Sequence, residues 1–94
     1  MSKLNIIKNG LLLVKDNLSK KDFLLLNTLL GDRKFVDFIE LTRAMLRKEK
    51  GKPREERDKM FIFNLENTIF ETTEYYKQTL PQDEEDILES YDEL

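Results

Sequence analysis

The sequence predicts an all-α protein, a compact bundle of three to four main helices followed by an acidic C-terminal tail. Three observations support this fold class. The 94 residues suffice for one small domain, apolar residues recur at helical spacing along most of the chain, and only three glycines and two prolines interrupt the pattern. We expect the bundle to occupy residues 1–81. The tail, disordered or folded as one short helix, is expected over residues 82–94.

A stripe of apolar residues through residues 3–17 favours a first helix. Its members are Leu4, Ile7, Leu11, Val14 and Leu18, which cover about 80° of a helix at about 100° per residue. Asn9-Gly10 interrupts the stripe, and a glycine costs a helix roughly 1 kcal/mol relative to alanine. Asn-Gly between two apolar runs is also the strongest short signal for a β-hairpin. A hairpin over residues 4–15 therefore stays open as the alternative.

The second helix is expected to begin after Ser19 and to end at Gly31. The run Ser19-Lys20-Lys21-Asp22 has the form of a capping box, in which the serine hydroxyl accepts from the third helical N–H. Apolar residues then cover most of the helix circumference, which is typical of a helix buried on all sides. They are Phe23, Leu24, Leu25, Leu26, Leu29 and Leu30.

The third helix has the clearest amphipathic pattern and is expected over about residues 33–50, with Asp32 as its cap. Its inner face comprises Phe35, Phe38, Ile39, Leu41, Thr42, Met45 and Leu46. Charged residues occupy the opposite face, so this helix is expected to lie at the surface with one side in the core.

Gly51-Lys52-Pro53 separates the third helix from the fourth, which is expected over about residues 54–79. Pro53 suits the start of a helix, and Pro81 ends it because the residue before a proline disfavours helical geometry. The inward stripe of this helix is Phe61, Ile62, Leu65, Ile69, Thr72, Thr73, Tyr76 and Leu80. The core of the bundle is expected to comprise Leu26, Leu29, Leu30, Phe35, Phe38, Ile39, Leu46, Phe61, Leu65, Ile69 and Tyr76.

The amino-acid composition argues against catalysis. The chain has no cysteine and no histidine, which removes disulfides, thiolate nucleophiles, the usual general base and the commonest metal ligand. Glu66, Glu71 and Glu74 point in different directions around the fourth helix, so they form no paired-carboxylate site. We therefore expect no enzymatic activity, no cofactor and no bound metal.

The distribution of apolar residues argues against insertion in a membrane. The longest apolar runs have four residues, whereas a membrane-spanning helix needs about 20. The first residues, Met1-Ser2-Lys3-Leu4, show no cleavable signal pattern. We expect a cytoplasmic protein.

Charge is unevenly distributed along the chain. Residues 82–94 carry seven acidic side chains and no basic one, which leaves sixteen bases against twelve acids elsewhere, a net +4. Residues 47–59, here called the basic segment, carry seven bases against four acids. The second and third helices loosely resemble a helix-turn-helix, so the alternative function is DNA binding. Its phosphate contacts would come from Arg43, Arg47, Lys48, Lys50, Lys52, Arg54, Arg57 and Lys59.

Surplus apolar residues point instead to a protein partner. Met60, Phe63, Phe70 and Tyr75 exceed what one core-facing stripe of the fourth helix needs, and such residues are enriched at interfaces. Ile87, Leu88 and Tyr91 recur at helical spacing in the tail and suit a docking segment. The alternatives are a fourth helix buried on two sides and a tail that is merely solvated or shields the basic segment. We favour a non-enzymatic interaction protein that binds a larger protein as adaptor, inhibitor or accessory regulator, with a homodimer as one form.

Overall fold

The predicted all-α fold is confirmed by a computed structural model that describes residues 2–79. These residues form α1 (Lys3–Leu13), α2 (Lys20–Gly31), α3 (Phe35–Lys50) and α4 (Lys59–Thr79), and they contain no strand. Two single turns of 3₁₀ helix, η1 (Lys15–Asn17) and η2 (Arg54–Glu56), lie in the connections. The acidic tail lies outside the described residues.

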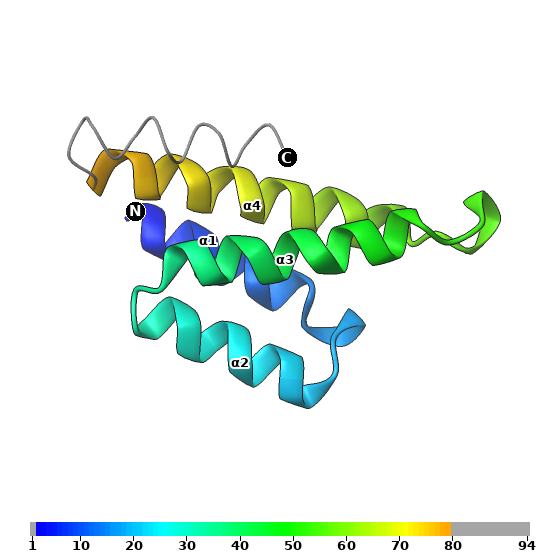
Figure 1. The fold of residues 1–94 in the computed structure, drawn as a ribbon, viewed down its shortest axis with the longest axis horizontal. Helices are drawn as coiled ribbons and strands as arrows, with labels where there is room; N and C mark the ends of the chain where they lie inside the picture. The colour runs from blue at the N-terminus through cyan, green and yellow to red at the C-terminus, as the bar shows by residue number, and fades with distance from the viewer. Residues whose placement is uncertain (1, 80–94) are drawn as a thin grey trace.

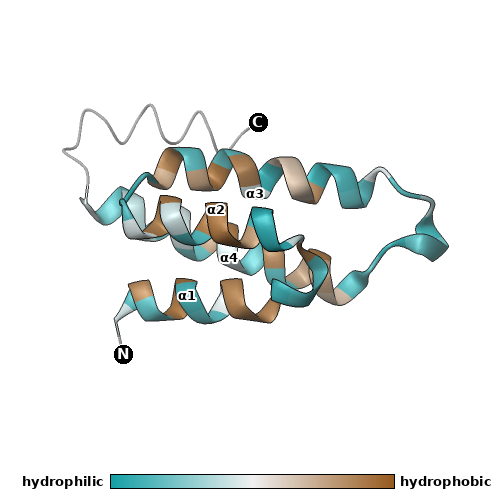
Figure 2. Ribbon diagram, turned by 90° about the horizontal axis from the view of Figure 1, so that it is seen from below, coloured by the Kyte–Doolittle hydropathy of each residue, from teal (hydrophilic) through white to brown (hydrophobic). Residues whose placement is uncertain are grey.

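The four helices form an up-and-down bundle. Helices α1 and α3 run in one direction, while α2 and α4 run in the other (Figure 1). Helix α4 makes its closest backbone contacts with α1 and α3, whereas α2 makes its closest contacts with α3. Seen from below, α2 lies in front of α4, with α1 and α3 on either side (Figure 2). Helices α2 and α4 therefore occupy opposite corners of the bundle.

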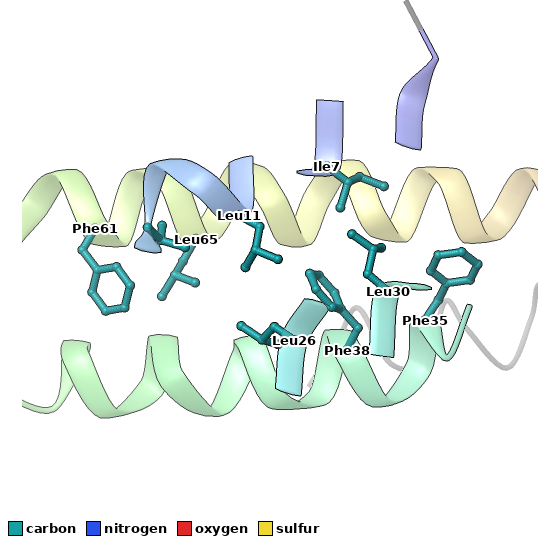
Figure 3. Close-up of a cluster of buried hydrophobic side chains, with 9 residues drawn as sticks. Ile7, Leu11, Leu26, Leu30, Phe35, Phe38, Phe61 and Leu65 are labelled. Carbon is teal, nitrogen blue, oxygen red and sulfur yellow. The ribbon is translucent and has the colours of Figure 1, made fainter. Parts of the chain in front are cut away.

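The core receives side chains from all four helices. Ile7, Leu11, Leu26, Leu30, Phe35, Phe38, Phe61 and Leu65 point toward one another, and none is more than 6% exposed (Figure 3). Seven of the eleven predicted core residues are buried. The other four, Leu29, Leu46, Ile69 and Tyr76, are half-buried. The stripe of the first helix contributes Ile7, Leu11 and Val14 to the same core.

The hairpin alternative for residues 4–15 is wrong, because this stretch is helical. Ser2 caps α1, since its Oγ accepts from the N–H of Asn5 at 3.3 Å. Gly10 lies where α1 packs on α4, and a Cβ atom at this position would stand 2.5 Å from Oγ1 of Thr68. The glycine thus serves close helix packing rather than a turn.

Helix α2 begins as predicted but is less buried than predicted. The Ser19 Oγ accepts from the N–H of Asp22 at 3.1 Å, which confirms the cap. Burial on all sides is wrong, because Leu24 and Leu25 are 53% and 43% exposed. A helix at a corner of the bundle has neighbours on one side only, so its outer leucines remain in contact with solvent.

Two predicted helix starts are also wrong. Asp32 ends α2 instead of capping α3, which begins at Phe35 without a side-chain cap. The intervening Arg33 has φ of 59°, in the left-handed region. Helix α4 begins at Lys59 rather than near residue 54, because Asp58 is its cap: the Asp58 Oδ1 accepts from the N–H of Phe61 at 3.0 Å.

Candidate interaction surface

One side of α4 has no described helix packed against it. The residues on this side, here called the outer face of α4, are Lys59, Phe63, Glu66, Asn67, Phe70, Glu74 and Lys77. At about 100° per residue they lie within an arc of about 100°, opposite the buried Phe61 and Leu65. All seven are exposed or half-buried. Figure 1 shows this helix at the edge of the bundle farthest from α2.

Two phenylalanines dominate the outer face of α4. Phe63 is 56% exposed and Phe70 is 59% exposed. They are seven residues apart, so they lie on one line about 10 Å from each other. Exposed aromatic side chains in line on a helix are typical of a surface that binds another protein.

A groove of about 370 Å³ runs along the α3 side of Phe70. It is lined by Arg43, Leu46, Glu66, Ile69, Phe70, Thr73 and Glu74. The hydroxyl of Thr73 is buried here and has no hydrogen-bond partner among residues 2–79. Thr68 and Thr72 on the same helix instead donate to the carbonyl oxygens of Asn64 and Thr68, four residues earlier.

A second groove of about 410 Å³ lies between α1 and α4. It is lined by Ile6, Asn9, Gly10, Leu13, Asn64, Asn67, Thr68 and Glu71. Ile6 and Leu13 are 39% and 66% exposed and form its apolar rim on α1. The sequence prediction missed this pair, although both residues fall outside the inward stripe of α1 and are seven residues apart.

The structure brings together only part of the predicted partner-binding set. Phe63 and Phe70 share the outer face of α4, and Met60, 66% exposed, lies near its start. Tyr75 lies on a different side, where its ring packs edge-on against that of Phe35 at 5.3 Å between centroids. The remaining predicted residues, Ile87, Leu88 and Tyr91, lie outside the described residues.

The basic segment covers the end of α3 and the connection to α4, which projects beyond one end of the bundle (Figure 1). Several of its cations are already engaged. The Lys50 Nζ lies 3.4 Å from a carboxylate oxygen of Glu66, and the Arg57 Nε donates to the carbonyl oxygen of Lys52 at 2.9 Å. Arg43, which precedes the basic segment on α3 and belongs to the predicted phosphate-binding set, also has a partner. Among residues 2–79, Arg47, Lys48, Arg54 and Lys59 have no partner for their charge.

A hydrogen-bonded joint fixes this connection to the bundle. Glu49, only 6% exposed, accepts from the N–H of Asp58 at 2.9 Å and pairs with the Lys52 ammonium at 3.0 Å. The Asp58 carboxylate accepts in turn from the side-chain amide of Asn17 at 2.8 Å. The joint therefore links residues from η1, the end of α3 and the start of α4.

Hydrogen bonding stabilises the charged form of both carboxylates in the joint. The N–H of Asp58, followed by the Lys52 ammonium, holds the pKa of Glu49 below its ordinary value of 4.5. The N–H of Phe61, followed by the Asn17 amide, holds the pKa of Asp58 below its ordinary value of 3.8. Both groups are consequently charged at neutral pH and serve the structure of the connection.

The sequence prediction that Glu66, Glu71 and Glu74 all point apart is only partly right, because Glu66 and Glu74 line the same groove. Glu66 lines the groove next to α3, whereas Glu71 lines the groove next to α1. Within residues 2–79 no cluster of three acidic side chains is placed to hold a metal ion. No helix in this part of the chain has the length and apolar character needed to span a bilayer. Comparisons with protein families, with curated proteins and with solved structures found no match for this chain.

Proposed function

We propose that this protein acts by binding another protein through the outer face of α4, without catalysing a reaction. The observation that carries the proposal is the pair of half-exposed phenylalanines, Phe63 and Phe70, in line on a helix whose opposite side forms the core. Burying such rings on association removes apolar surface from water, at roughly 25 cal/mol per Å². The cytoplasm is the proposed setting, because a chain without cysteine needs no oxidising compartment.

The grooves beside α4 also favour its outer face as the binding surface. A helix that carries only exposed apolar side chains offers a flat contact, whereas Phe70 borders a groove of about 370 Å³ next to α3. A partner's side chain can therefore enter beside the ring instead of only resting on it. Helix α2 exposes Leu24 and Leu25 to a similar degree, but no groove described above involves them.

The test is affinity purification from an extract of the source cells, followed by quantitative mass spectrometry. We expect the combined change Phe63→Ser and Phe70→Ser to remove a partner that the unchanged chain retains. Leu24→Ser with Leu25→Ser is the matched control, since it removes two exposed apolar side chains, 53% and 43% exposed, from α2. Circular dichroism verifies that both variants remain helical. Unchanged recovery of every partner by the phenylalanine variant contradicts the proposal.

The tail supplies a proposed second contact. Ile87, Leu88 and Tyr91 give the acidic segment three apolar anchors, and an acidic docking segment needs such anchors to add affinity beyond charge. Replacing all three by serine, with the seven carboxylates kept, is expected to weaken recovery of the same partner. Equal recovery would leave the outer face of α4 as the sole contact.

Nucleic-acid binding is the second candidate, and the projecting basic segment favours it. Arg47 and Arg54 have no partner among the described residues and are exposed. If they contact phosphates, duplex DNA binds at low salt, and Arg47→Ala with Arg54→Ala weakens that binding. A gel-shift assay at low ionic strength that shows no complex removes this candidate. Asp37 and Glu40 in the first turns of α3 oppose it, because carboxylates repel phosphate.

A further inference from the structure

We propose that the outer face of α4 binds a second copy of this chain, with the two α4 helices antiparallel, so that the acidic tail of each copy meets the basic segment of the other. The inference rests on the proposed function, because it uses the same surface and names its partner. Three independent features of the chain support it: the spacing of the phenylalanines, the order of charges along the outer face of α4, and the positions of the tail and the basic segment.

The spacing of the phenylalanines suits a twofold axis. In a symmetric dimer the same patch is used twice, so a residue that contacts a second residue across the interface is matched by the reverse contact. An axis that crosses the helix pair between residues 66 and 67 places Phe63 of one copy beside Phe70 of the other, twice. This axis lies near the middle of Lys59–Thr79, so both helices contribute most of their length.

The charges on the outer face of α4 follow the same symmetry. In the register that pairs the phenylalanines, Lys59 of one copy lies opposite Glu74 of the other copy. Neither side chain has a partner among the described residues. Glu66 lies next to the axis, where two copies would repel, but its charge is compensated by Lys50 at 3.4 Å. Asn67 beside it is neutral and offers both a donor and an acceptor.

A parallel pair of helices would set like charges together. It would place Lys59 beside Lys59 and Glu74 beside Glu74, and it would gather two tails of seven carboxylates each at one end. The antiparallel pair instead brings each tail, which follows Thr79 in the chain, to the end where the other copy's α4 begins. Because exposed charges interact only within about 8 Å at physiological salt, this proximity decides which orientation is favoured.

The length of α4 sets the distance between the start of the tail and the start of α4 in the same copy. The 21 residues of α4 place its two ends about 30 Å apart, at about 1.5 Å per residue. Thr79, after which the tail follows in the chain, therefore lies about 30 Å from Lys59 of its own copy. In the antiparallel pair, the basic segment of the other copy lies where the tail starts.

The first experiment measures the oligomeric state of the full chain by size-exclusion chromatography with light scattering. We expect twice the chain mass of 11.2 kDa for the unchanged protein. Phe63→Ser with Phe70→Ser is expected to give a monomer of unchanged helical content, because both rings are more than half exposed. The matched control, Leu12→Ser with Leu24→Ser, changes two leucines that are 58% and 53% exposed and is expected to remain dimeric.

The second experiment tests the orientation. Because the chain has no cysteine, a single introduced cysteine reports one contact only. Lys59→Cys protein and Glu74→Cys protein, differing in a mass tag, are mixed and oxidised. The antiparallel register predicts mixed disulfide dimers in excess over either self-linked dimer. Charge reversal gives a second readout: Lys59→Glu weakens the dimer, and adding Glu74→Lys restores it.

The outcomes separate this inference from the proposed function. A monomer at every concentration overturns the inference, yet the proposed function stands if the phenylalanine variant still loses a different protein partner. A dimer that survives Phe63→Ser with Phe70→Ser overturns the inference, because its interface then lies elsewhere. Self-linked dimers of Lys59→Cys in excess overturn the antiparallel arrangement.

Discussion

Gly10 shows how one residue sets the distance between two helices. A Cβ atom there would approach Oγ1 of Thr68 to 2.5 Å, and that oxygen is held by its hydrogen bond to the carbonyl oxygen of Asn64 at 2.8 Å. Alanine adds about 1 kcal/mol of helix propensity, but overpacking typically costs about 1–3 kcal/mol. We expect Gly10→Ala to lower the free energy of unfolding by about 1 kcal/mol, measured by urea denaturation.

The double variant isolates the cause of that loss. With Thr68→Ala already present, the oxygen that would clash is absent. Gly10→Ala is then expected to raise the free energy of unfolding by up to about 1 kcal/mol, the gain in helix propensity. If Gly10→Ala already stabilises the unchanged chain, the two helices do not approach as closely as described here.

Buried threonines give α4 polar groups inside the bundle. The hydroxyl of Thr72 donates to the carbonyl oxygen of Thr68 at 2.7 Å, whereas the buried hydroxyl of Thr73 has no partner in the described part of the chain. A buried hydroxyl without a partner costs about 1–3 kcal/mol, so Thr73→Val is expected to leave the free energy of unfolding unchanged or to raise it by about 1 kcal/mol. Thr72→Val, the matched control, loses a hydrogen bond and is expected to lower it by about 1 kcal/mol. Equal losses in the two variants would show that the Thr73 hydroxyl is paired in solution.

The connection between α3 and α4 is held by charged groups rather than by apolar packing. Glu49 and Asp58 have pKa values below their ordinary values of 4.5 and 3.8, because hydrogen bonds from N–H groups favour the ionised carboxylates. Such groups stabilise the fold above their unfolded pKa values, and this stabilisation is lost as the pH falls through the lower, folded values. Above about pH 5, we expect the titration of these two groups to have no effect on the Tm. As the pH is lowered from 4.5 through 3.8 and below, we expect their protonation to decrease the Tm.

The pH dependence can be assigned by substitution. Glu49→Gln with Asp58→Asn is expected to lower the Tm at neutral pH and to flatten its decrease in acid, because the two titrating groups are gone. Glu55→Gln with Glu56→Gln changes two exposed carboxylates of the same connection and serves as the control. An acid-induced decrease that is as steep in the joint variant as in the unchanged chain would contradict this assignment.

Helix α2 illustrates how position in a bundle overrides composition. Its six apolar residues surround the helix, yet only Leu26 and Leu30 are buried. The helix sits at the corner opposite α4, so the side carrying Leu24 and Leu25 has no described neighbour. Helix α4 contacts both α1 and α3, and no described helix packs on its outer face. The same bundle thus leaves leucines exposed on one corner and phenylalanines exposed on the other.

Taken as a whole, the chain places its basic segment before most of α4 and its acidic segment after α4 in the sequence. The basic segment projects at the end where α4 begins, and the acidic residues follow the other end of that helix in the sequence. A domain of this size buries only about 60–65% of the surface of its unfolded chain. Covering the outer face of α4 would therefore add a substantial fraction to a small core, which is the physical reason to expect association.

The sequence by itself determined the all-α class and most of the core positions, and it singled out the two phenylalanines of the candidate surface. These follow from local rules: apolar spacing, the capping serine at residue 19, and the absence of catalytic and metal-binding residue types. The sequence did not decide whether the first segment is a helix or a hairpin. The reason is that the dipeptide Asn9-Gly10 is compatible both with a hairpin turn and with a glycine where two helices pack closely.

Only the tertiary structure decided what depends on residues distant in sequence. Asn17 and Asp58 form a hydrogen bond although they are 41 positions apart in the sequence. Gly10 of α1 packs directly against Thr68 of α4, although α2 and α3 lie between them in the sequence. Which leucines of α2 are exposed, and which side of α4 remains open, depends on the number of neighbours that each helix has. The spacing of apolar residues within one helix does not give the number of its neighbours, because that number depends on how all four helices pack around one core.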